Sequence, residues 1–208
     1  PDDVDYAQIP WRNSRFDSEL LTQHWATQQR AQNAFEQYQE KAGKRTLAFC
    51  CSTGHADFMR QYFQEKGIRA VAVHSGPSSD GRAVSLEQLS QGQVDVVFSV
   101  DMFNEGIDLP NVDTVLMLRP TESRLIWLQQ LGRGLRWQAG KTLRVIDYIG
   151  NHRSFLIKPQ ALFQALLGIG QGYAPVVQTL RRVREGTLQV DLPPGGAITY
   201  DLETINIL

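Results

Sequence analysis

The sequence lacks an excess of charge of either sign. Its 208 residues contain 21 Lys and Arg against 22 Asp and Glu, so the formal net charge is −1. A neutral chain has no global attraction for a polyanion, and any phosphate site must be a local patch. The content of 42% hydrophobic and 21% charged residues is that of a globular protein and excludes collagen-like and wholly disordered classes.

Cysteines and long apolar runs are also scarce. The two cysteines, Cys50 and Cys51, are adjacent and cannot build a disulfide framework. No apolar run approaches the roughly 20 residues of a transmembrane helix, and residues 1–10 lack the basic-then-apolar pattern of a signal peptide. We therefore expect an intracellular protein with no membrane partner. The chain begins with Pro1 rather than Met, so we interpret it as a fragment.

From residue 46 onward, short apolar segments alternate with helical ones. We predict strands over residues 46–51, 69–74, 94–100, 113–118 and 142–149, separated by helices over residues 55–66, 80–91 and 123–132. Each interval is long enough for a crossover helix, and the strands are apolar throughout, as in sheets covered on both faces. The predicted fold class is α/β, with a parallel sheet flanked by helices.

The segments on either side differ from this pattern. Upstream, residues 17–42 carry apolar side chains at helical spacing and predict an amphipathic helix that Gly43 ends. Downstream, residues 155–167 predict a closing helix, and a Pro-Pro-Gly-Gly turn predicts a β-hairpin over residues 188–201. We therefore divide the chain into residues 1–44, a linker and helix; residues 45–167, the main domain; and residues 168–208, a C-terminal extension with a hairpin.

Candidate functional residues follow the strands, because ligands of parallel α/β sheets bind at the carboxyl ends of the strands. Arg133 and Arg136 share one helix face in a predicted helix that also holds Gly132 and Gly134. Arginine suits phosphate recognition, although a solvated basic helix end is the alternative. Residues 119–153 contain seven basic and two acidic side chains, which favours a polyanion near this segment.

Two other kinds of site are not expected. Residues 139–142 resemble the end of a P-loop, but Gly134 and Gly140 are one residue too far apart and Thr142 begins a predicted strand. The chain therefore has no cradle that would bind a nucleoside triphosphate tightly by itself. We also expect no metal site from Cys50, Cys51 and the histidines near them, because adjacent cysteines on a strand point to opposite faces.

In their order along the chain, these segments resemble the second RecA-like lobe of superfamily 2 DEAD/DEAH-type helicases and translocases, near type III restriction and excision-repair helicases. Residues 46–52 resemble motif IV, His74-Ser75-Gly76 resembles motif IVa, residues 104–110 resemble motif V and residues 129–136 resemble motif VI. The resemblance covers about residues 45–157 and implies a RecA-like helicase C-terminal domain.

The resemblance implies one face toward ATP. Arg133 and Arg136 would be arginine fingers for ATP held on an N-terminal RecA-like lobe of the same parent chain, with Gly106, Asp108 and Gln129 at that interface. ATP and Mg²⁺ would bind mainly to the other lobe, with no cofactor in the fragment. The parent would be a nucleoside-triphosphate hydrolase, and the fragment alone would be inactive.

The resemblance also implies a face toward one strand of nucleic acid. Short polar side chains and bare backbone suit phosphates rather than bases, so the strand would be gripped without regard to sequence. The residues expected to contact it are Ser52, Thr53, His74, Ser75, Gly76, Asp101 and Asn104. DNA is the expected polymer and RNA the alternative, in a cytoplasmic or nucleoid-associated protein. His55 is expected to be structural. For His74, contact with the nucleic-acid backbone and packing within the turn are equal alternatives.

Two other functions are considered. The first alternative is a stand-alone nucleic-acid or protein-docking module without motor activity. Such a module has no need of both Arg133 and Arg136. A Rossmann-like enzyme for a small cofactor is disfavoured, because no Gly-x-Gly-x-x-Gly follows the first strand of the main domain.

Overall fold

The computed structural model describes residues 9–12, 15–16, 18–101, 112–119, 143–148, 160–161, 163–164, 167–185 and 187–188. The helices are α1 (Ser18–Trp25), α2 (Gln28–Lys41), α3 (Thr53–Glu65), α4 (Arg82–Gln91) and α7 (Tyr173–Arg184). The strands are β1 (Trp11–Arg12), β2 (Arg15–Phe16), β3 (Thr46–Phe49), β4 (Ala70–Val73), β5 (Val96–Ser99), β6 (Thr114–Met117) and β7 (Arg144–Asp147). No helix in these ranges is long and apolar enough to cross a membrane.

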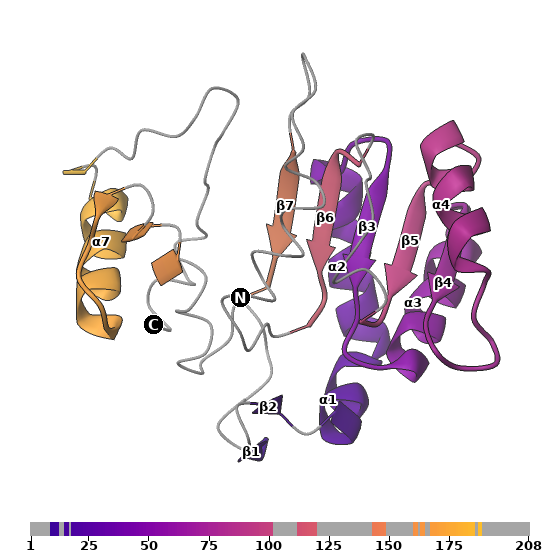
Figure 1. Cartoon of the computed structure of the whole chain (residues 1–208), viewed down its shortest axis with the longest axis horizontal. Helices are drawn as coiled ribbons and strands as arrows, with labels where there is room; N and C mark the ends of the chain where they lie inside the picture. The colour runs from indigo at the N-terminus through magenta and orange to yellow at the C-terminus, as the bar shows by residue number, and fades with distance from the viewer. Residues whose placement is uncertain are drawn as a thin grey trace.

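The five longer strands form one parallel sheet in the order β4-β5-β3-β6-β7, with β4 and β7 at its edges (Figure 1). In the central register, Ala48 of β3 lies opposite Phe98 of β5 and Leu116 of β6. Each strand lies within one of the five predicted ranges, so the prediction of a parallel α/β sheet is confirmed. The short pair β1 and β2, which is antiparallel and was not predicted, lies apart from this sheet.

The side chains of the sheet alternate between two apolar clusters, one on each face. Ala48 belongs to the cluster that contains Phe35 of α2 and Phe63 of α3. Leu47 belongs to the other cluster, which contains Leu89 of α4. Helices therefore cover both faces, and the central strands β3, β5 and β6 are buried at every position. The edge strand β7 departs from the predicted apolar pattern, because Arg144 and Val145 are exposed.

The predicted helix over residues 17–42 is two helices, and this corrects the prediction. Thr27 interrupts it with an extended backbone (φ −113°, ψ 148°), and the Thr27 hydroxyl accepts a hydrogen bond from the backbone N–H of Arg30 at 3.4 Å. Thr27 is thus the N-cap of α2, and capping residues favour a new helix start over continuation. The second helix ends at Lys41, just before the predicted stop at Gly43.

Helix α2 shares the hydrophobic core of the sheet. Ala31, Ala34, Phe35 and Tyr38 are buried, and the rings of Phe35 and Tyr38 both lie 5.2 Å from that of Phe63 on α3. Helix α2 therefore buries its apolar face against the same cluster as α3, although the predicted boundary at residue 45 lies between the two helices.

The remaining predicted helices differ in how much of them is described. The helices predicted over residues 55–66 and 80–91 are observed as α3 and α4, and the left-handed Gly92 (φ 73°) caps the C-terminus of α4. The helix predicted over residues 123–132 and the hairpin at 188–201 lie outside the described residues, as does much of the helix at 155–167.

Helix α7 was not predicted. It follows Gly172 and carries Pro175 in its first turn, where proline is tolerated. Val176 and Leu180 are buried and form a small cluster with Phe163. The C-terminal extension therefore contains a helix with its own apolar contacts.

Candidate nucleic-acid interface

The carboxyl ends of β4, β5 and β3 lie side by side because these strands are parallel neighbours. Ser52 and Thr53 follow β3, His74 to Gly76 follow β4, and Asp101 follows β5. A Cβ atom built at Gly76 would lie 3.8 Å from the Cβ of Thr53, so the segment after β4 approaches the segment after β3 closely. The structure thus gathers six of the predicted site residues at one edge of the sheet.

The other predicted site residues lie outside the described residues. They are Asn104, Gly106, Asp108, Gln129, Arg133 and Arg136. Their assigned contacts with ATP and nucleic acid therefore stay predictions.

Ser52 begins α3 as its N-cap. Its hydroxyl oxygen accepts hydrogen bonds from the backbone N–H of His55 at 3.1 Å and from the hydroxyl of Thr22 at 2.6 Å. The second contact ties α1 to the end of β3. Both interactions use the Ser52 oxygen as an acceptor, and the same hydroxyl also interacts with the side chain of Cys51.

His55 lies in the first turn of α3 and is buried. Its Nδ1 lies 3.4 Å from the backbone nitrogen of Cys51 and 3.2 Å from the Cys51 sulfur. Burial, followed by the nearby charge of Arg30, lowers the pKa of His55 to about 3. Burial raises the pKa of Cys51 to about 11. At neutral pH this is a neutral imidazole beside a protonated thiol, which is an arrangement that supports folding and is unsuited to nucleophilic catalysis.

The two adjacent cysteines do not lie on opposite faces as expected. Cys50 is part of the same cluster that Cys51 packs against, because β3 ends at Phe49 and the alternation of a strand stops there. Among the described residues, no group of three or more His, Cys, Asp or Glu side chains is placed to hold a metal ion.

His74 directly follows β4, and its side chain is fully buried. Its Nδ1 accepts a hydrogen bond from the backbone N–H of Gly76 at 3.0 Å, so the ring proton lies on Nε2, which faces Asp57 Oδ1 at 3.3 Å. The imidazole therefore shapes the loop from inside. The Gly76 N–H is used in this contact, whereas the Ser75 side chain is exposed.

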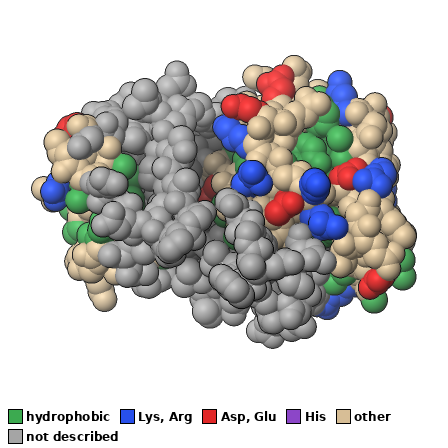
Figure 2. All heavy atoms as spheres, turned by 90° about the horizontal axis from the view of Figure 1, so that it is seen from above, with side chains coloured by type: hydrophobic (Ala, Val, Ile, Leu, Met, Phe, Trp, Pro, Cys, Tyr) green, Lys and Arg blue, Asp and Glu red, His purple; other side chains and the backbone are tan. Residues whose placement is uncertain are grey.

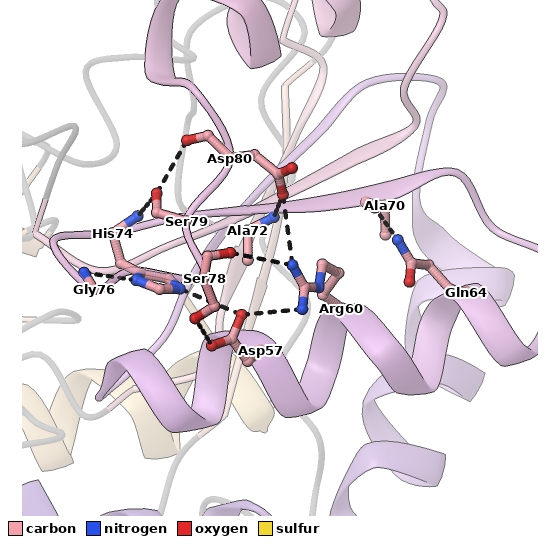
Figure 3. A network of polar contacts seen from close by, with 10 residues as sticks. All are labelled: Asp57, Arg60, Gln64, Ala70, Ala72, His74, Gly76, Ser78, Ser79 and Asp80. Carbon is pink, nitrogen blue, oxygen red and sulfur yellow. Dashed lines mark hydrogen bonds and ion pairs between the residues drawn. The ribbon is translucent and has the colours of Figure 1, made fainter.

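Asp57 on α3 is the centre of this network (Figure 3). It accepts hydrogen bonds from His74 and from the Ser78 hydroxyl, the latter at 2.6 Å, and pairs with Arg60 Nη2 at 3.3 Å. Burial acts to raise the pKa of Asp57, but the bonds from Ser78 and His74 and the charge of Arg60 outweigh it and hold that pKa below its usual value. Asp57 is thus an anion with every nearby partner donating to it.

The same loop covers the free edge of β4. The Asp80 carboxylate accepts from the N–H of Ala72 at 2.9 Å, and the N–H of Asp80 donates to the Ala72 carbonyl at 2.7 Å. The hydroxyl of Ser79 accepts from the N–H of His74, and Gln64 donates to the carbonyl of Ala70. These outward-facing backbone groups of an edge strand are thereby paired, which blocks pairing with another strand.

Asp101 has a left-handed backbone (φ 52°), which few residue types other than glycine adopt. Its Oδ1 accepts from Arg119 Nη1 at 2.6 Å, and Arg119 follows β6. Because β3 lies between β5 and β6, this ion pair reaches across the end of the central strand. It joins the segment that follows β5 to the segment that follows β6.

The opposite edge of the sheet carries charges of both signs. In Figure 1, α1 lies at the bottom, and its Thr22 contacts Ser52 just after β3, so the carboxyl ends of the strands are at the bottom. Figure 2 is seen from above and therefore faces the amino-terminal ends of the strands. Lys and Arg are interspersed with Asp and Glu on the described part of this face, and Arg69 Nε pairs with Asp95 Oδ2 at 3.0 Å. No patch of one sign gathers there.

Sequence reasoning missed Asp57, Arg60, Thr22 and Arg119. Asp57 and Arg60 had a signal, because acid and base three residues apart share one face of a predicted helix. Arg119 follows a predicted strand directly. Thr22 had no signal of its own, since its partner Ser52 is 30 residues away.

The chain matches a known protein family. Residues 29–138, more than half of its length, match the helicase conserved C-terminal domain. The chain is 35% identical over 113 residues to IRC3 of Saccharomyces cerevisiae, which is named as an ATP-dependent helicase, covering 54% of this chain and 16% of that protein. It is 33% identical over 132 residues to UvrABC system protein B of Kosmotoga olearia, covering 60% of this chain and 20% of the relative.

Solved structures agree on the fold. The C-terminal domain of the DEAD-box protein Dbp5 superposes with a TM-score of 0.56 and 15% identity, covering 73% of this chain and 89% of that domain. The chain therefore has the RecA-like fold of helicase C-terminal domains. It spans only a fifth or less of the two curated relatives.

Proposed function

The chain belongs to the helicase conserved C-terminal domain family, with superfamily 2 helicases as relatives, and from this membership we propose that it is the second motor lobe of an ATP-dependent helicase or translocase. The parent would be an enzyme that couples hydrolysis of ATP to movement along nucleic acid. The observation that carries the proposal is the gathering of the motif IV and motif IVa residues at one edge of a RecA-like sheet.

The turn after β3 is not the glycine-rich cradle that a P-loop places between a strand and a helix. The turn between β3 and α3 reads Cys-Cys-Ser-Thr, with no glycine-rich stretch, and its Ser52 hydroxyl caps the helix. In the proposal, ATP and Mg²⁺ bind mainly to an N-terminal RecA-like lobe. Arg133 and Arg136 would reach that ATP as arginine fingers, which neutralise charge developing on the γ-phosphate. Gly106, Asp108 and Gln129 would line the same interface.

The carboxyl edge of the sheet would grip one strand of nucleic acid, with DNA as the first choice and RNA as the second. Thr53 and the exposed Ser75 are the side chains best placed to donate to phosphates. Ser52 would contribute its hydroxyl, while His74 and Gly76 would act by shaping the loop. Asp101 and Asn104 would link this grip to the ATP interface.

A binding measurement on this chain tests the grip. We expect a fluorescein-labelled single-stranded oligonucleotide to bind weakly, with an affinity that falls steeply as salt is added. Ser75→Glu, which adds one negative charge at the carboxyl edge, should weaken binding about fivefold at low salt. Gln93→Glu adds the same charge at the exposed amino-terminal edge and should change binding less than about twofold.

Two results would contradict the proposed grip. Equal weakening by both variants would mean that only overall charge matters. Absence of binding by the chain and by the full-length protein, with or without an ATP analogue, would remove the nucleic-acid face and favour a protein-docking module.

A further inference from the structure

We propose that Asp57 is a positioning residue that locks two nucleic-acid contacts, the start of α3 and the loop after β4, into one rigid unit. The proposal rests on the proposed function and assigns to Asp57 a task that the sequence motifs do not cover. Asp57 would touch no phosphate itself.

The geometry supports this because Asp57 is joined to the loop at two separate points. Its Oδ1 faces the Nε2 of His74 at 3.3 Å, and its Oδ2 accepts from the hydroxyl of Ser78 at 2.6 Å. Figure 3 shows Asp57 on α3, with contacts to both of these loop residues. Both carboxylate oxygens are thus committed to one loop, at its first residue and four residues later.

We call the contacts of Asp57 with His74 and Ser78 the lock. Arg60, one turn further along α3, adds to it. It pairs with Asp57 and reaches the Ser78 carbonyl at 3.4 Å, and its Nη1 lies 3.7 Å from Asp80, which caps the edge of β4. The loop is therefore attached to α3 and to β4 at the same time. Neither attachment uses Ser75, which stays exposed between them.

Thr53 and Gly76 approach each other near the contacts that Asp57 makes with His74 and Ser78. Asp57 is one helical turn after Thr53, and His74 transmits its position to Gly76 through the 3.0 Å bond from the Gly76 N–H. Thr53 and Ser75 are thereby held at a fixed separation before any ligand binds. Binding sites that are ordered in advance lose less conformational entropy on association.

Positioning and plain electrostatics predict opposite signs for removal of the Asp57 charge. Asp57→Asn deletes a negative charge close to a phosphate site, which by electrostatics alone strengthens binding. It also deprives the loop of an acceptor, because the amide keeps one oxygen for two donors. If the lock matters, Asp57→Asn weakens binding of the labelled single strand by about fivefold.

The experiment measures the affinity of this chain for that oligonucleotide well below the melting temperature of each variant. Ser78→Ala removes one bond at an exposed residue and should weaken binding about twofold. Glu65→Gln is the matched control, because it removes the same charge from the exposed end of the same helix and should leave the affinity unchanged. In wild-type protein, nitrogen NMR should show His74 with its proton on Nε2 and the Gly76 amide protected from exchange, and Asp57→Asn should lose that protection.

Unchanged or tighter binding by Asp57→Asn would overturn the proposal, as would equal weakening by Glu65→Gln. If wild-type protein binds and Asp57→Asn binds equally well, the lock is wrong and the grip survives. If wild-type protein does not bind at all, the proposed grip itself is wrong and the lock falls with it.

Discussion

At the scale of single residues, the carboxyl edge of the sheet is shaped by two buried histidines that remain inside the fold. His55 supports the first turn of α3, and His74 supports the loop after β4. Each uses Nδ1 as an acceptor for a backbone N–H, which only an imidazole without a proton on that nitrogen provides. The polar residues that face outward are therefore positioned by neutral rings.

The depressed pKa of His55 predicts acid sensitivity. Between about 6.5, the usual pKa, and about 3, the pKa in the fold, the unfolded chain binds a proton that the folded chain excludes. Stability contributed by this group is complete above pH 6.5 and is lost as the pH falls, at up to about 1.4 kcal/mol per pH unit. We expect urea unfolding at pH 4.5–7 to show this slope in wild-type protein.

His55→Asn provides the comparison. Its amide oxygen replaces Nδ1 as the acceptor for the Cys51 N–H but takes up no proton. The variant should therefore have a flatter pH dependence over the same range. An identical slope in both proteins would show that other groups cause the acid sensitivity.

The sequence identified which residues reach this edge but not what their side chains do there. Ser52, Thr53, His74, Ser75, Gly76 and Asp101 follow predicted strands, and parallel pairing alone brings them together. The inward turn of His74 depends on Asp57, which lies 17 residues earlier on a helix whose packing no local pattern specifies. Asp101 likewise pairs with Arg119, which lies 18 residues later in the chain and follows a strand that does not neighbour β5 in the sheet.

At the scale of elements, α2 packs as part of the lobe, because its buried side chains share the apolar cluster of the sheet. The apolar stripe over residues 17–42 correctly indicated a helix, and Phe35 and Tyr38 are buried as that stripe requires. The break at Thr27 escaped prediction because the hydrophobic spacing continues across it, whereas the cap is a single hydroxyl contact. The sheet was easier, since its continuous apolar runs occur only where both faces are covered.

Phe35→Ala tests whether α2 is integral to the lobe. The ring is 8% exposed and packs edge-on against Phe63, so truncation should lower the free energy of unfolding by about 3–5 kcal/mol. The exposed neighbour Glu36, changed to alanine, should alter it by less than about 0.5 kcal/mol. Urea unfolding followed by tryptophan fluorescence measures both. A loss below about 1 kcal/mol for Phe35→Ala would mean that α2 is an appendage, as the expected boundary at residue 45 implied.

At the scale of the whole molecule, we propose that the lobe is one of the two RecA-like lobes of an ATP-dependent motor. Its described part gathers six of the residues proposed to contact phosphates at one edge of the sheet. Its proposed contribution to hydrolysis, the pair Arg133 and Arg136, acts on a nucleotide that the other lobe holds. The account therefore predicts that catalysis requires both lobes in one protein.

The most direct test is ATP hydrolysis by the full-length protein with and without single-stranded DNA, duplex DNA and RNA. We predict that one of these polymers stimulates hydrolysis, and that Arg133→Ala or Arg136→Ala lowers the stimulated rate by about 10³-fold or more while ATP still binds. Arg181→Ala on α7, which removes an exposed arginine elsewhere, should hydrolyse ATP as wild-type protein does. Wild-type rates in both Arg133→Ala and Arg136→Ala would contradict the central claim that this chain is the lobe that supplies arginine fingers.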